Sequence, residues 1–443
     1  MPDLDDYALE PEEPFYQVAA EELHNAPGRL IRAEVLEADE DVHARLDAAA
    51  GTYRVLYEST SGTKKRNGQA IGVSGLIAFP RTPRPGGSPV LSWAHGTVGS
   101  ADKCAPSMDP FLTQEPGDCG LPLLRKINLA PHALLNAFLD DGWTVAMTDY
   151  EGLGTAGTHP YLLGDSEGRG ILDIVPAAHA LARHLRREPL SEQYAICGHS
   201  QGGQAALFAA HMAAHPEDYP GTVSFGNLTT VAALAPASNL ADGLETVYSL
   251  FVAFSDLGAF YPLFTTGVFC GDPDIDIDEI FQPDAKRRYL EDFDTMSRAE
   301  LSKENFWMKR PPVAVFPLLP TAGIFKSQPR YDEGNEAKEK AWNAYWAQVR
   351  AFTPAKPIDV PIRLSQAGGD DRVQPANTEA LKGQLEAING TGRVHYVFYA
   401  EGCVPAPDPE GLGEHFGLLV DPDEITDVLT WMNTHTPEEG GDA

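Results

Sequence analysis

The sequence predicts an α/β protein: a mostly parallel central sheet flanked by helices, with a helical cap inserted before the strand that carries an acidic residue. Three observations lead to this class. Apolar runs of strand length alternate with helical stretches along much of the chain, as buried parallel strands and their crossover helices do. One of these runs stops at a Gly-x-Ser-x-Gly motif and continues into a helical stretch, residues 193–210. The alternation is lost between residues 239 and 357, where a separate unit is expected.

The composition fits a globular protein and excludes one class of partner. A chain of 443 residues with 43% hydrophobic content can bury one large core or two smaller ones. The 33 Lys and Arg against 64 Asp and Glu give a formal charge of −31, which repels phosphate backbones and anionic lipid headgroups. Nucleic acid is therefore not expected as a partner. The oligomeric state stays open.

The N-terminus and the lengths of the apolar runs indicate where in the cell the protein is expected. Residues 1–6 contain neither a basic region nor an apolar stretch, so no signal peptide is expected in this sequence. No run approaches the ~20 apolar residues that cross a bilayer, so no membrane insertion is expected. The expected location is the cytoplasm, or the exterior if a leader was removed.

The five cysteines are Cys104, Cys119, Cys197, Cys270 and Cys403. They show neither a CxxC pair nor the Cys/His spacing of a metal site, so no metal is expected. Cys197 lies in the apolar run before the Gly-x-Ser-x-Gly motif and is interpreted as a buried, small apolar residue. The other four would form two bridges in an exported protein or remain thiols in the cytoplasm.

The chain divides into four expected parts. Residues 1–50 are acidic and helix-leaning, and they are expected to form an arm anchored by the aromatics of Pro14-Phe15-Tyr16. Residues 51–238 form the first part of the core and residues 358–443 the second. Between them, residues 239–357 are expected to form a mainly helical cap, whose aromatic side chains would line a pocket over the sheet.

Strands of the core are expected where apolar and β-branched residues cluster. An antiparallel pair at the sheet edge is expected at 53–59 and 69–80. Buried parallel strands are expected at 89–94, 144–148, 194–197, 229–235 and 362–365, followed by a final strand at 393–399.

Ser200 is the expected nucleophile. It is the centre of the motif at 198–202, where a tight turn lifts the hydroxyl out of the backbone and the two glycines leave room for their neighbours. A chain with 41 Gly shows such a motif by accident with odds on the order of 0.15, so the strand-turn-helix context decides. A second copy around Ser166 follows no strand-like run. Ser166 is interpreted as the N-cap of a helix at 171–185.

A serine nucleophile needs a base, and the base needs an acid that holds its tautomer. These groups are expected where strands end, because loops at the carboxyl edge of an open sheet meet there. Asp370 follows the strand-like run at 362–365 and stands three residues before Val373. This spacing favours Asp370 as the acid over Asp371, which is interpreted as a solvated loop residue.

His415 is the expected base. It lies in a glycine-bearing loop between the final strand and the final helix, and it completes the chain order Ser, Asp, His. His395 alternates within the final strand, and His435 lies just past the last helix. Neither of these two fits a catalytic loop.

The oxyanion of an acyl-transfer intermediate needs hydrogen-bond donors. One is expected from the backbone amide of Gln201, the residue after the nucleophile. The other is expected from Thr97, with Gly96 as the alternative, in the loop after the strand at 89–94. The ring of His95 is interpreted as a brace of this loop.

With these residues, the sequence resembles the α/β-hydrolase superfamily and, within it, the secretory lipase family, which includes lipases of the lipase A type and bacterial relatives. The resemblance covers nearly the whole chain. It is carried by Pro14-Phe15-Tyr16, Trp93-Ala94-His95-Gly96-Thr97, Cys104-Ala105-Pro106-Ser107, Asp149-Tyr150-Glu151-Gly152-Leu153-Gly154, Gly198-His199-Ser200-Gln201-Gly202-Gly203 and the loops of Asp370 and His415. The resemblance implies the α/β-hydrolase fold, esterase or lipase activity, a triad on Ser200, Asp370 and His415, and a bridge from Cys104 to the cap, where Cys270 is the only cysteine.

The expected function is a serine carboxylic-ester hydrolase that acts on a small-molecule ester or lipid through an acyl-enzyme, without a cofactor. An acyltransferase, or a serine peptidase or amidase, would use the same triad and remains an alternative. A non-catalytic binding protein of this fold is disfavoured because all three triad positions are filled. Acyl-chain length and alcohol preference are left open by the sequence.

Overall fold

The structure is a computed structural model that describes residues 8, 10–36, 46–108, 128–239, 260–271, 286–287, 289–290, 295, 356–406 and 413–438. Cys119 and most of the expected cap, including its aromatics at 306–325, lie outside the described residues. Within the expected cap the longest described element is helix α6 (Phe260–Gly271).

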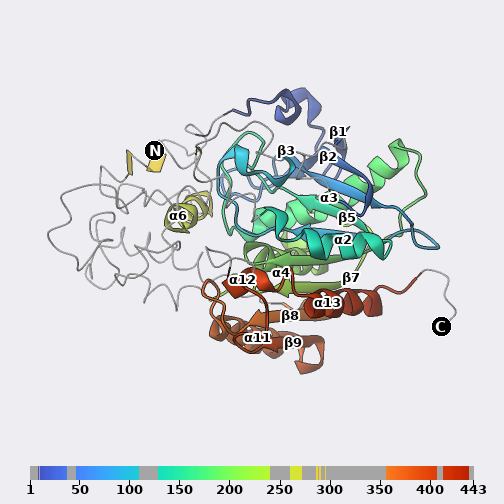
Figure 1. Ribbon diagram of the computed structural model, residues 1–443. Coiled ribbons are helices and arrows are strands. Elements are labelled where there is room, and N and C mark those ends of the chain that lie inside the picture. The colour runs from blue at the N-terminus through green and yellow to red at the C-terminus, as the bar shows by residue number, and fades with distance from the viewer. Residues whose placement is uncertain are drawn as a thin grey trace, which may run out of the picture.

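The described strands form one nine-stranded sheet in the order β1-β2-β3-β5-β4-β6-β7-β8-β9 (Figure 1). Their bounds are β1 Leu30–Val35, β2 Ala49–Thr60, β3 Ala70–Pro80, β4 Val90–Ala94, β5 Thr144–Thr148, β6 Gln193–His199, β7 Asn227–Leu234, β8 Ile362–Ala367 and β9 Val394–Tyr399. Each parallel or antiparallel strand expected within the core is confirmed.

The N-terminal side of the sheet is antiparallel. Strands β2 and β3 pair along their whole length, and β3 then pairs antiparallel with β5. Among the described residues before position 50, Leu30–Val35 differ from the helix-leaning expectation, because they form β1, which pairs antiparallel with β2. The aromatic anchors hold as expected: Phe15 and Tyr16 are buried, and the Tyr16 hydroxyl lies 3.1 Å from Ser107 Oγ.

From β5 to β9 all the strands are parallel. The carboxyl ends of these strands therefore meet at one edge of the sheet, where ligand sites of open α/β sheets form. Each of the loops that carries an expected catalytic residue leaves from this edge. These loops follow β4, β6, β8 and β9.

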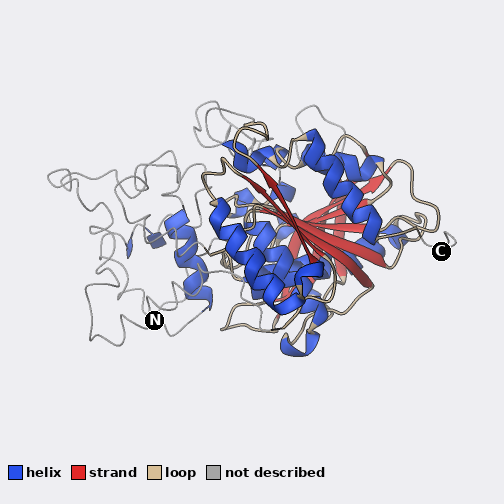
Figure 2. Cartoon of the chain, turned by 90° about the horizontal axis from the view of Figure 1, so that it is seen from below, coloured by secondary structure: helices blue, strands red, loops and turns tan. Residues whose placement is uncertain are grey.

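Helices cover both faces of the twisted sheet (Figure 2). Helices α3 (Gly164–His184) and α4 (Gln201–Ala214) pack together on one face, and α2 (His132–Asp140) and α13 (Pro422–His435) pack together on the other. Helix α11 (Pro375–Asn389) covers β8 and β9. A short helix, α12 (Gly413–Gly417), lies between β9 and α13.

Glycines in α3 let it approach α4 closely. A Cβ on Gly164 would lie 2.1 Å from the ring of Phe208, and one on Gly168 would lie 2.5 Å from the sulfur of Met212. A side chain in either place would force Phe208 or Met212 to move, so the two helices approach each other through the glycines of α3. This contact brings the buried residues of the first turns of α3 within reach of the N-terminus of α4.

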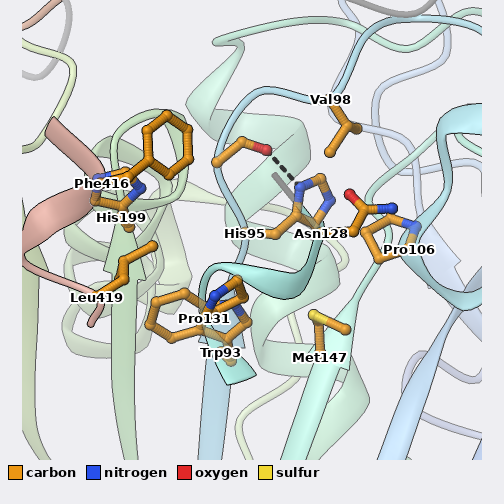
Figure 3. Close-up of a pocket in the computed structure, with 11 residues that line it drawn as sticks. Trp93, His95, Val98, Pro106, Asn128, Pro131, Met147, His199, Phe416 and Leu419 are labelled. Carbon is orange, nitrogen blue, oxygen red and sulfur yellow. Dashed lines mark hydrogen bonds between the residues drawn. The ribbon is translucent and has the colours of Figure 1, made fainter. Parts of the chain in front are cut away.

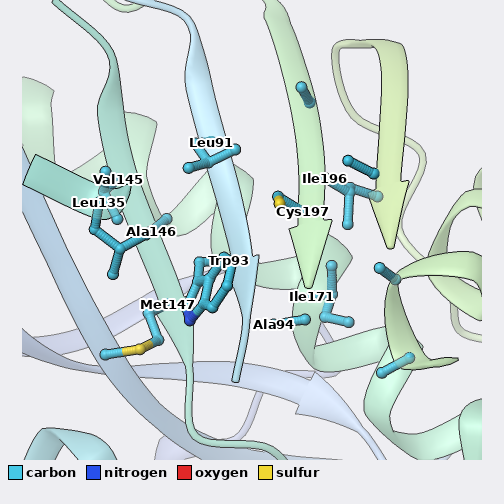
Figure 4. Packing of buried hydrophobic residues seen from close by; sticks show 14 of the residues in the cluster. Leu91, Trp93, Ala94, Leu135, Val145, Ala146, Met147, Ile171, Ile196 and Cys197 are labelled. Carbon is cyan, nitrogen blue, oxygen red and sulfur yellow. The ribbon is translucent and has the colours of Figure 1, made fainter. Parts of the chain in front are cut away.

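The core lies on both sides of the parallel strands. Leu91 and Trp93 of β4, Val145 of β5 and Cys197 of β6 are all at most 2% exposed (Figure 4). Burying a large apolar side chain contributes about 1.5–3 kcal/mol to stability, so this layer holds the central strands together. Cys197 is part of the core, as expected, and burial raises the pKa of its thiol.

Candidate active site

Ser200 occupies the turn between the end of β6 and the start of α4. Its backbone angles are φ 59° and ψ −119°, a conformation that costs a residue with a side chain about 1–3 kcal/mol and persists only when the surroundings enforce it. Such a strained strand-to-helix turn displays the hydroxyl of its serine at the edge of the sheet. Ser200 is partly exposed at this edge.

The two glycines of the motif are required by the packing of the turn. A Cβ on Gly198 would lie 2.1 Å from the carbonyl oxygen of Gly202. A Cβ on Gly202 would lie 2.0 Å from the carbonyl oxygen of Ala94 at the end of β4. The turn therefore sits directly against the neighbouring strand, which explains why both positions lack a side chain.

Asp370 and His415 meet at the ends of β8 and β9. The Nδ1 of His415 lies 2.7 Å from Asp370 Oδ2, and both side chains are at most 1% exposed. The other oxygen of Asp370 accepts backbone N–H bonds of 2.9 Å from Arg372 and from Val373. The acid turn thus holds the carboxylate in one orientation, aimed at the ring of His415.

The environment of Asp370 favours its ionised form. Burial raises the pKa of this carboxyl, but the charge of His415, the hydrogen bond from His415 and the two backbone N–H bonds outweigh it, so the pKa lies below its ordinary value. Asp371 differs, because its side chain is 73% exposed and accepts a 3.2 Å hydrogen bond from the guanidinium of its neighbour Arg372.

His199 connects the serine turn to the histidine loop. Its Nε2 donates a 2.8 Å hydrogen bond to the backbone carbonyl oxygen of His415, and the two rings lie 4.5 Å apart. Burial lowers the pKa of His199 to about 3, so this ring is neutral. Because His199 directly precedes Ser200, the backbone of His415 is tied to the turn that carries the serine.

The loop after β4 lies against the serine turn. A Cβ on Gly96 would lie 3.6 Å from the Cβ of Ser200, so the loop is in van der Waals range of the serine. The next residue, Thr97, is 6% exposed, and its hydroxyl lies 2.8 Å from that of Tyr161. Gln201, on the other side of Ser200, is the first residue of α4, so its backbone N–H has no carbonyl one turn back in the helix.

His95 braces the same loop. Its Nδ1 lies 2.7 Å from the carbonyl oxygen of Gly96, and its Nε2 lies 3.3 Å from that of Asp149. The Tyr150 hydroxyl donates a 2.9 Å hydrogen bond to the carbonyl of His95. Burial lowers the pKa of His95 to about 4, so the ring acts as a neutral hydrogen-bonding group.

Ser166 lies in a different setting from Ser200. Helix α3 begins at Gly164 rather than at residue 171, and its N-cap is Leu163. The expectation that Ser166 caps the helix is therefore wrong: it lies inside the first turn, where its hydroxyl donates a 2.5 Å hydrogen bond to the carboxylate of Glu151. Ser166 is 2% exposed, and its own φ is not in the positive range that Ser200 adopts.

A small cavity lies behind the loop after β4, with His95, His199 and Phe416 around it (Figure 3). Its volume is about 20 Å³, which is enough for one water molecule. Trp93 Nε1 and both polar atoms of the Asn128 side chain are buried at its wall without a partner among the described residues. A water molecule in this cavity would accept hydrogen bonds from the indole N–H of Trp93 and the amide NH₂ of Asn128, and donate one to the amide oxygen of Asn128.

Helix α6 reaches this region from the expected cap. Phe264 of α6 is buried, and its ring lies 5.6 Å from that of Tyr161, which in turn contacts Thr97. The expected acyl pocket remains a prediction, because the rest of its lining lies outside the described residues. The bridge implied between Cys104 and Cys270 also remains a prediction: Cys104 is buried in the 3₁₀ turn Asp102–Cys104, and Cys270 lies near the end of α6.

Four residues at this site were not anticipated from the sequence: His199, His159, Tyr161 and Glu167. His199 occupies the variable position before the serine, and its role depends on a loop more than two hundred residues away. Glu167 belongs to the second Gly-x-Ser-x-Gly copy, where it occupies a variable position that the motif does not define. Each of the four also contacts a residue at least 34 positions away in the chain, and no local pattern marks these contacts.

Among the described residues, no group of three or more His, Cys, Asp or Glu side chains is arranged to hold a metal ion. None of the described helices is both long and apolar enough to cross a bilayer.

The parallel sheet, its two helical layers and the strained serine at the carboxyl edge define an α/β-hydrolase fold. Solved structures of a lipase and an esterase are among those that share it. Candida antarctica lipase A in its closed state aligns with a TM-score of 0.61 at 17% identity, over 89% of this chain and 82% of that one. The rice cell wall degrading esterase LipA from Xanthomonas oryzae aligns with a TM-score of 0.64 at 18% identity, over 93% and 100%.

Sequence comparison finds similarity to one family over part of the chain. A family model described as secretory lipase matches residues 127–263. Lipase A of Arthroderma benhamiae is 29% identical over 211 residues, which cover 47% of this chain and 41% of that protein. The match thus spans less than half the length of this curated relative. A second family model, described as the Periviscerokinin family, matches only residues 72–82, most of which belong to the buried strand β3.

Proposed function

We propose that this protein is a serine carboxylic-ester hydrolase, an esterase or lipase, in which Ser200 is the nucleophile, His415 the general base and Asp370 the acid that orients it. The observation that carries the proposal is a strained, partly exposed serine turn that the His199–His415 hydrogen bond links to a buried Asp370–His415 pair at the same edge of the sheet. The match to secretory lipases and the fold shared with a lipase and an esterase support the same chemistry.

In the proposed reaction, Ser200 Oγ attacks the ester carbonyl carbon while His415 Nε2 takes its proton. The carbonyl oxygen becomes an oxyanion, which accepts hydrogen bonds from the backbone amides of Gln201 and Thr97. His415 then gives the proton to the departing alcohol, which leaves an acyl-enzyme. Water, activated by His415, releases the acid and restores Ser200.

Asp370 supplies orientation rather than a proton in this scheme. Its hydrogen bond to Nδ1 fixes the tautomer in which Nε2 of His415 is the proton acceptor. The depressed pKa of Asp370 keeps it ionised, so it also stabilises the imidazolium that forms during the reaction.

The proposed substrate is a small-molecule ester or a lipid, and the match to the secretory lipase family favours secretion. A series of p-nitrophenyl esters from acetate to palmitate tests the proposal and separates an esterase from a lipase by its chain-length profile. A burst of p-nitrophenol equal to the enzyme concentration is expected if an acyl-enzyme accumulates. Absence of hydrolysis across the whole series would contradict the proposal. Methanol or an amine, added as a competing acceptor, measures any acyl transfer.

A further inference from the structure

The side chain of Gln201 is held in a buried network that the reaction scheme does not use. Its carboxamide nitrogen donates a 2.6 Å hydrogen bond to Glu167 Oε1 and lies 3.1 Å from Nε2 of His159. Glu167 belongs to the first turns of α3, and His159 to the loop that precedes α3. All three residues are at most 1% exposed. The residue that follows the nucleophile is thus anchored from two other segments of the chain.

The protonation states in this network are determined by its backbone contacts. Nδ1 of His159 lies 3.0 Å from the carbonyl oxygen of Glu151, which can only accept, so the ring proton resides on Nδ1. Burial lowers the pKa of His159 to about 3, so Nε2 carries no proton and is an acceptor. The carboxamide oxygen of Gln201 cannot donate a hydrogen bond to that nitrogen, whereas its NH₂ group can. The NH₂ group therefore faces His159, and this fixes which way the carboxamide points.

Glu167 receives the second N–H of the same NH₂ group. Its Oε1 also accepts a 2.9 Å hydrogen bond from the backbone N–H of Leu162, so one oxygen accepts twice. Its Oε2 has no partner among the described residues and is buried. This asymmetry suits a neutral carboxyl group, and burial raises the pKa of Glu167 to about 8. A neutral group here places no negative charge beside a developing oxyanion.

The anchored residue stands where the serine turn is strained. Ser200 keeps φ 59° and ψ −119° only because its neighbours hold it, and Gln201 supplies the next peptide nitrogen. An oxyanion donor must stay within about 0.5 Å of its productive place to be effective. A carboxamide clamped by two hydrogen bonds limits the rotation of the whole residue, including its backbone N–H.

We propose that Glu167 and His159 are positioning residues for the oxyanion hole: by binding the carboxamide of Gln201 from two sides, they hold its backbone N–H on the oxygen of the reacting ester. This inference rests on the proposed ester hydrolase function. Neither residue touches the substrate, and both act through Gln201.

The test compares kcat, KM and the inhibition constant of an alkyl trifluoromethyl ketone. Ser200 Oγ adds to the ketone carbonyl, its proton goes to His415, and the resulting oxyanion occupies the same hole. Glu167→Met removes the acceptor of Gln201, and Gln201→Leu removes the carboxamide while leaving the backbone N–H. Each variant is expected to lose kcat by about 10- to 100-fold, less than the 10²–10³ of deleting an oxyanion donor. KM is expected to stay within about threefold, and the inhibition constant to rise by the same factor as kcat falls.

Two further variants separate positioning from general packing. Glu167→Gln keeps an acceptor for Gln201 and is expected to restore most of the kcat that Glu167→Met loses. Gln204→Leu is the matched control, because Gln204 is a buried residue on the same helix and donates a 3.2 Å hydrogen bond to the carbonyl of Leu162. It is expected to lower stability without the loss of kcat. The double variant Glu167→Met/Gln201→Leu is expected to lose no more kcat than the larger single loss, because the two residues act as one unit.

Thermal unfolding of every variant is measured alongside, and Gln201→Leu keeps the test informative if Glu167→Met does not fold. The proposal is overturned if the wild type hydrolyses esters while both variants keep more than half of its kcat, or if Gln204→Leu loses as much. It is also overturned if the variants raise KM and leave the ketone affinity unchanged. In these cases the ester hydrolase proposal stands, whereas a wild type that hydrolyses no ester overturns both.

Discussion

The ring of His199 donates a 2.8 Å hydrogen bond to the backbone carbonyl oxygen of His415, two hundred and more residues further along the chain. The bond joins the residue before the proposed nucleophile to the proposed base itself. Since His199 is neutral and buried, the contact is a directional hydrogen bond rather than a charge attraction. It makes the position of the base depend on the end of β6.

His199→Phe tests this contact, because phenylalanine fills a similar space and donates nothing. The carbonyl of His415 is left without its donor, so the free energy of unfolding is expected to fall by about 1–3 kcal/mol. We expect kcat/KM to fall by at least about tenfold, since a small displacement of a catalytic group costs that much or more. Urea unfolding and ester hydrolysis measure the two effects. Unchanged kcat/KM in the folded variant would show that the base is positioned without His199.

Asp370→Asn removes the charge that orients His415 while keeping the size of the side chain. The amide does not enforce the tautomer with a free Nε2, so kcat is expected to fall by about 10²–10⁴-fold. Asp371→Asn is the matched control, because its side chain is 73% exposed. It is expected to keep its activity within about twofold. A reversed pair of results would transfer the acid role to Asp371.

The raised pKa of Glu167 predicts how stability depends on pH. The unfolded carboxyl loses its proton near pH 4.5, and the folded one near pH 8. Between these values the folded state binds more protons, so the free energy of unfolding decreases as pH rises, by up to about 1.4 kcal/mol per pH unit. Below pH 4.5 this contribution is fully present.

Glu167→Gln cannot ionise and isolates this effect. The stability of the variant relative to the wild type is expected to rise between pH 5 and pH 8 and to be constant outside this window. The other titratable groups near Glu167, namely His159, Tyr150 and Glu151, are present in both proteins and cancel in the difference. Urea unfolding at five or six pH values provides the measurement. A difference that does not vary with pH would mean that Glu167 is ionised in the folded state at neutral pH.

A pair of glycine variants tests the packing of the serine turn. Gly202→Ala would place a methyl group 2.0 Å from the carbonyl oxygen of Ala94, and that backbone cannot move without shifting β4. We expect a loss of at least about 3 kcal/mol in the free energy of unfolding. Gly383→Ala in α11 has no atom within 4 Å of the new methyl group, and a gain of about 0.5–1 kcal/mol is expected. Urea unfolding measures both free energies of unfolding. Equal changes in the two variants would contradict the close contact between Gly202 and the carbonyl of Ala94.

The strands were predictable because buried parallel strands are continuous apolar runs. The run at 144–148 and strand β5 coincide, and the others differ by a few residues. The start of α3 was not predictable, because Gly164 and Gly168 lower helix propensity and their value lies in the contact with α4. Strand β1 was missed for a related reason: none of its residues is fully buried, so its apolar pattern is weak.

The candidate catalytic residues could be found by chain order and by the strand that each one follows. Their supporting contacts could not be found in this way. The contact of Gln201 with Glu167, and that of His199 with His415, join residues far apart in the chain and depend on how the helices pack. Asp370 could be separated from Asp371 because an acid turn has a fixed spacing, which the two backbone N–H bonds to Asp370 explain.

The central claim is that Ser200 is the nucleophile of an ester hydrolase. Its most direct test is hydrolysis of p-nitrophenyl butyrate by the wild type, Ser200→Ala and Ser166→Ala, side by side. Ser166 is the matched control, since it occupies the same sequence motif but lies inside helix α3. We expect the wild type and Ser166→Ala to hydrolyse the ester and Ser200→Ala to lose at least about 10⁴-fold in kcat. Full activity in Ser200→Ala, or loss of activity in a folded Ser166→Ala alone, would contradict the account.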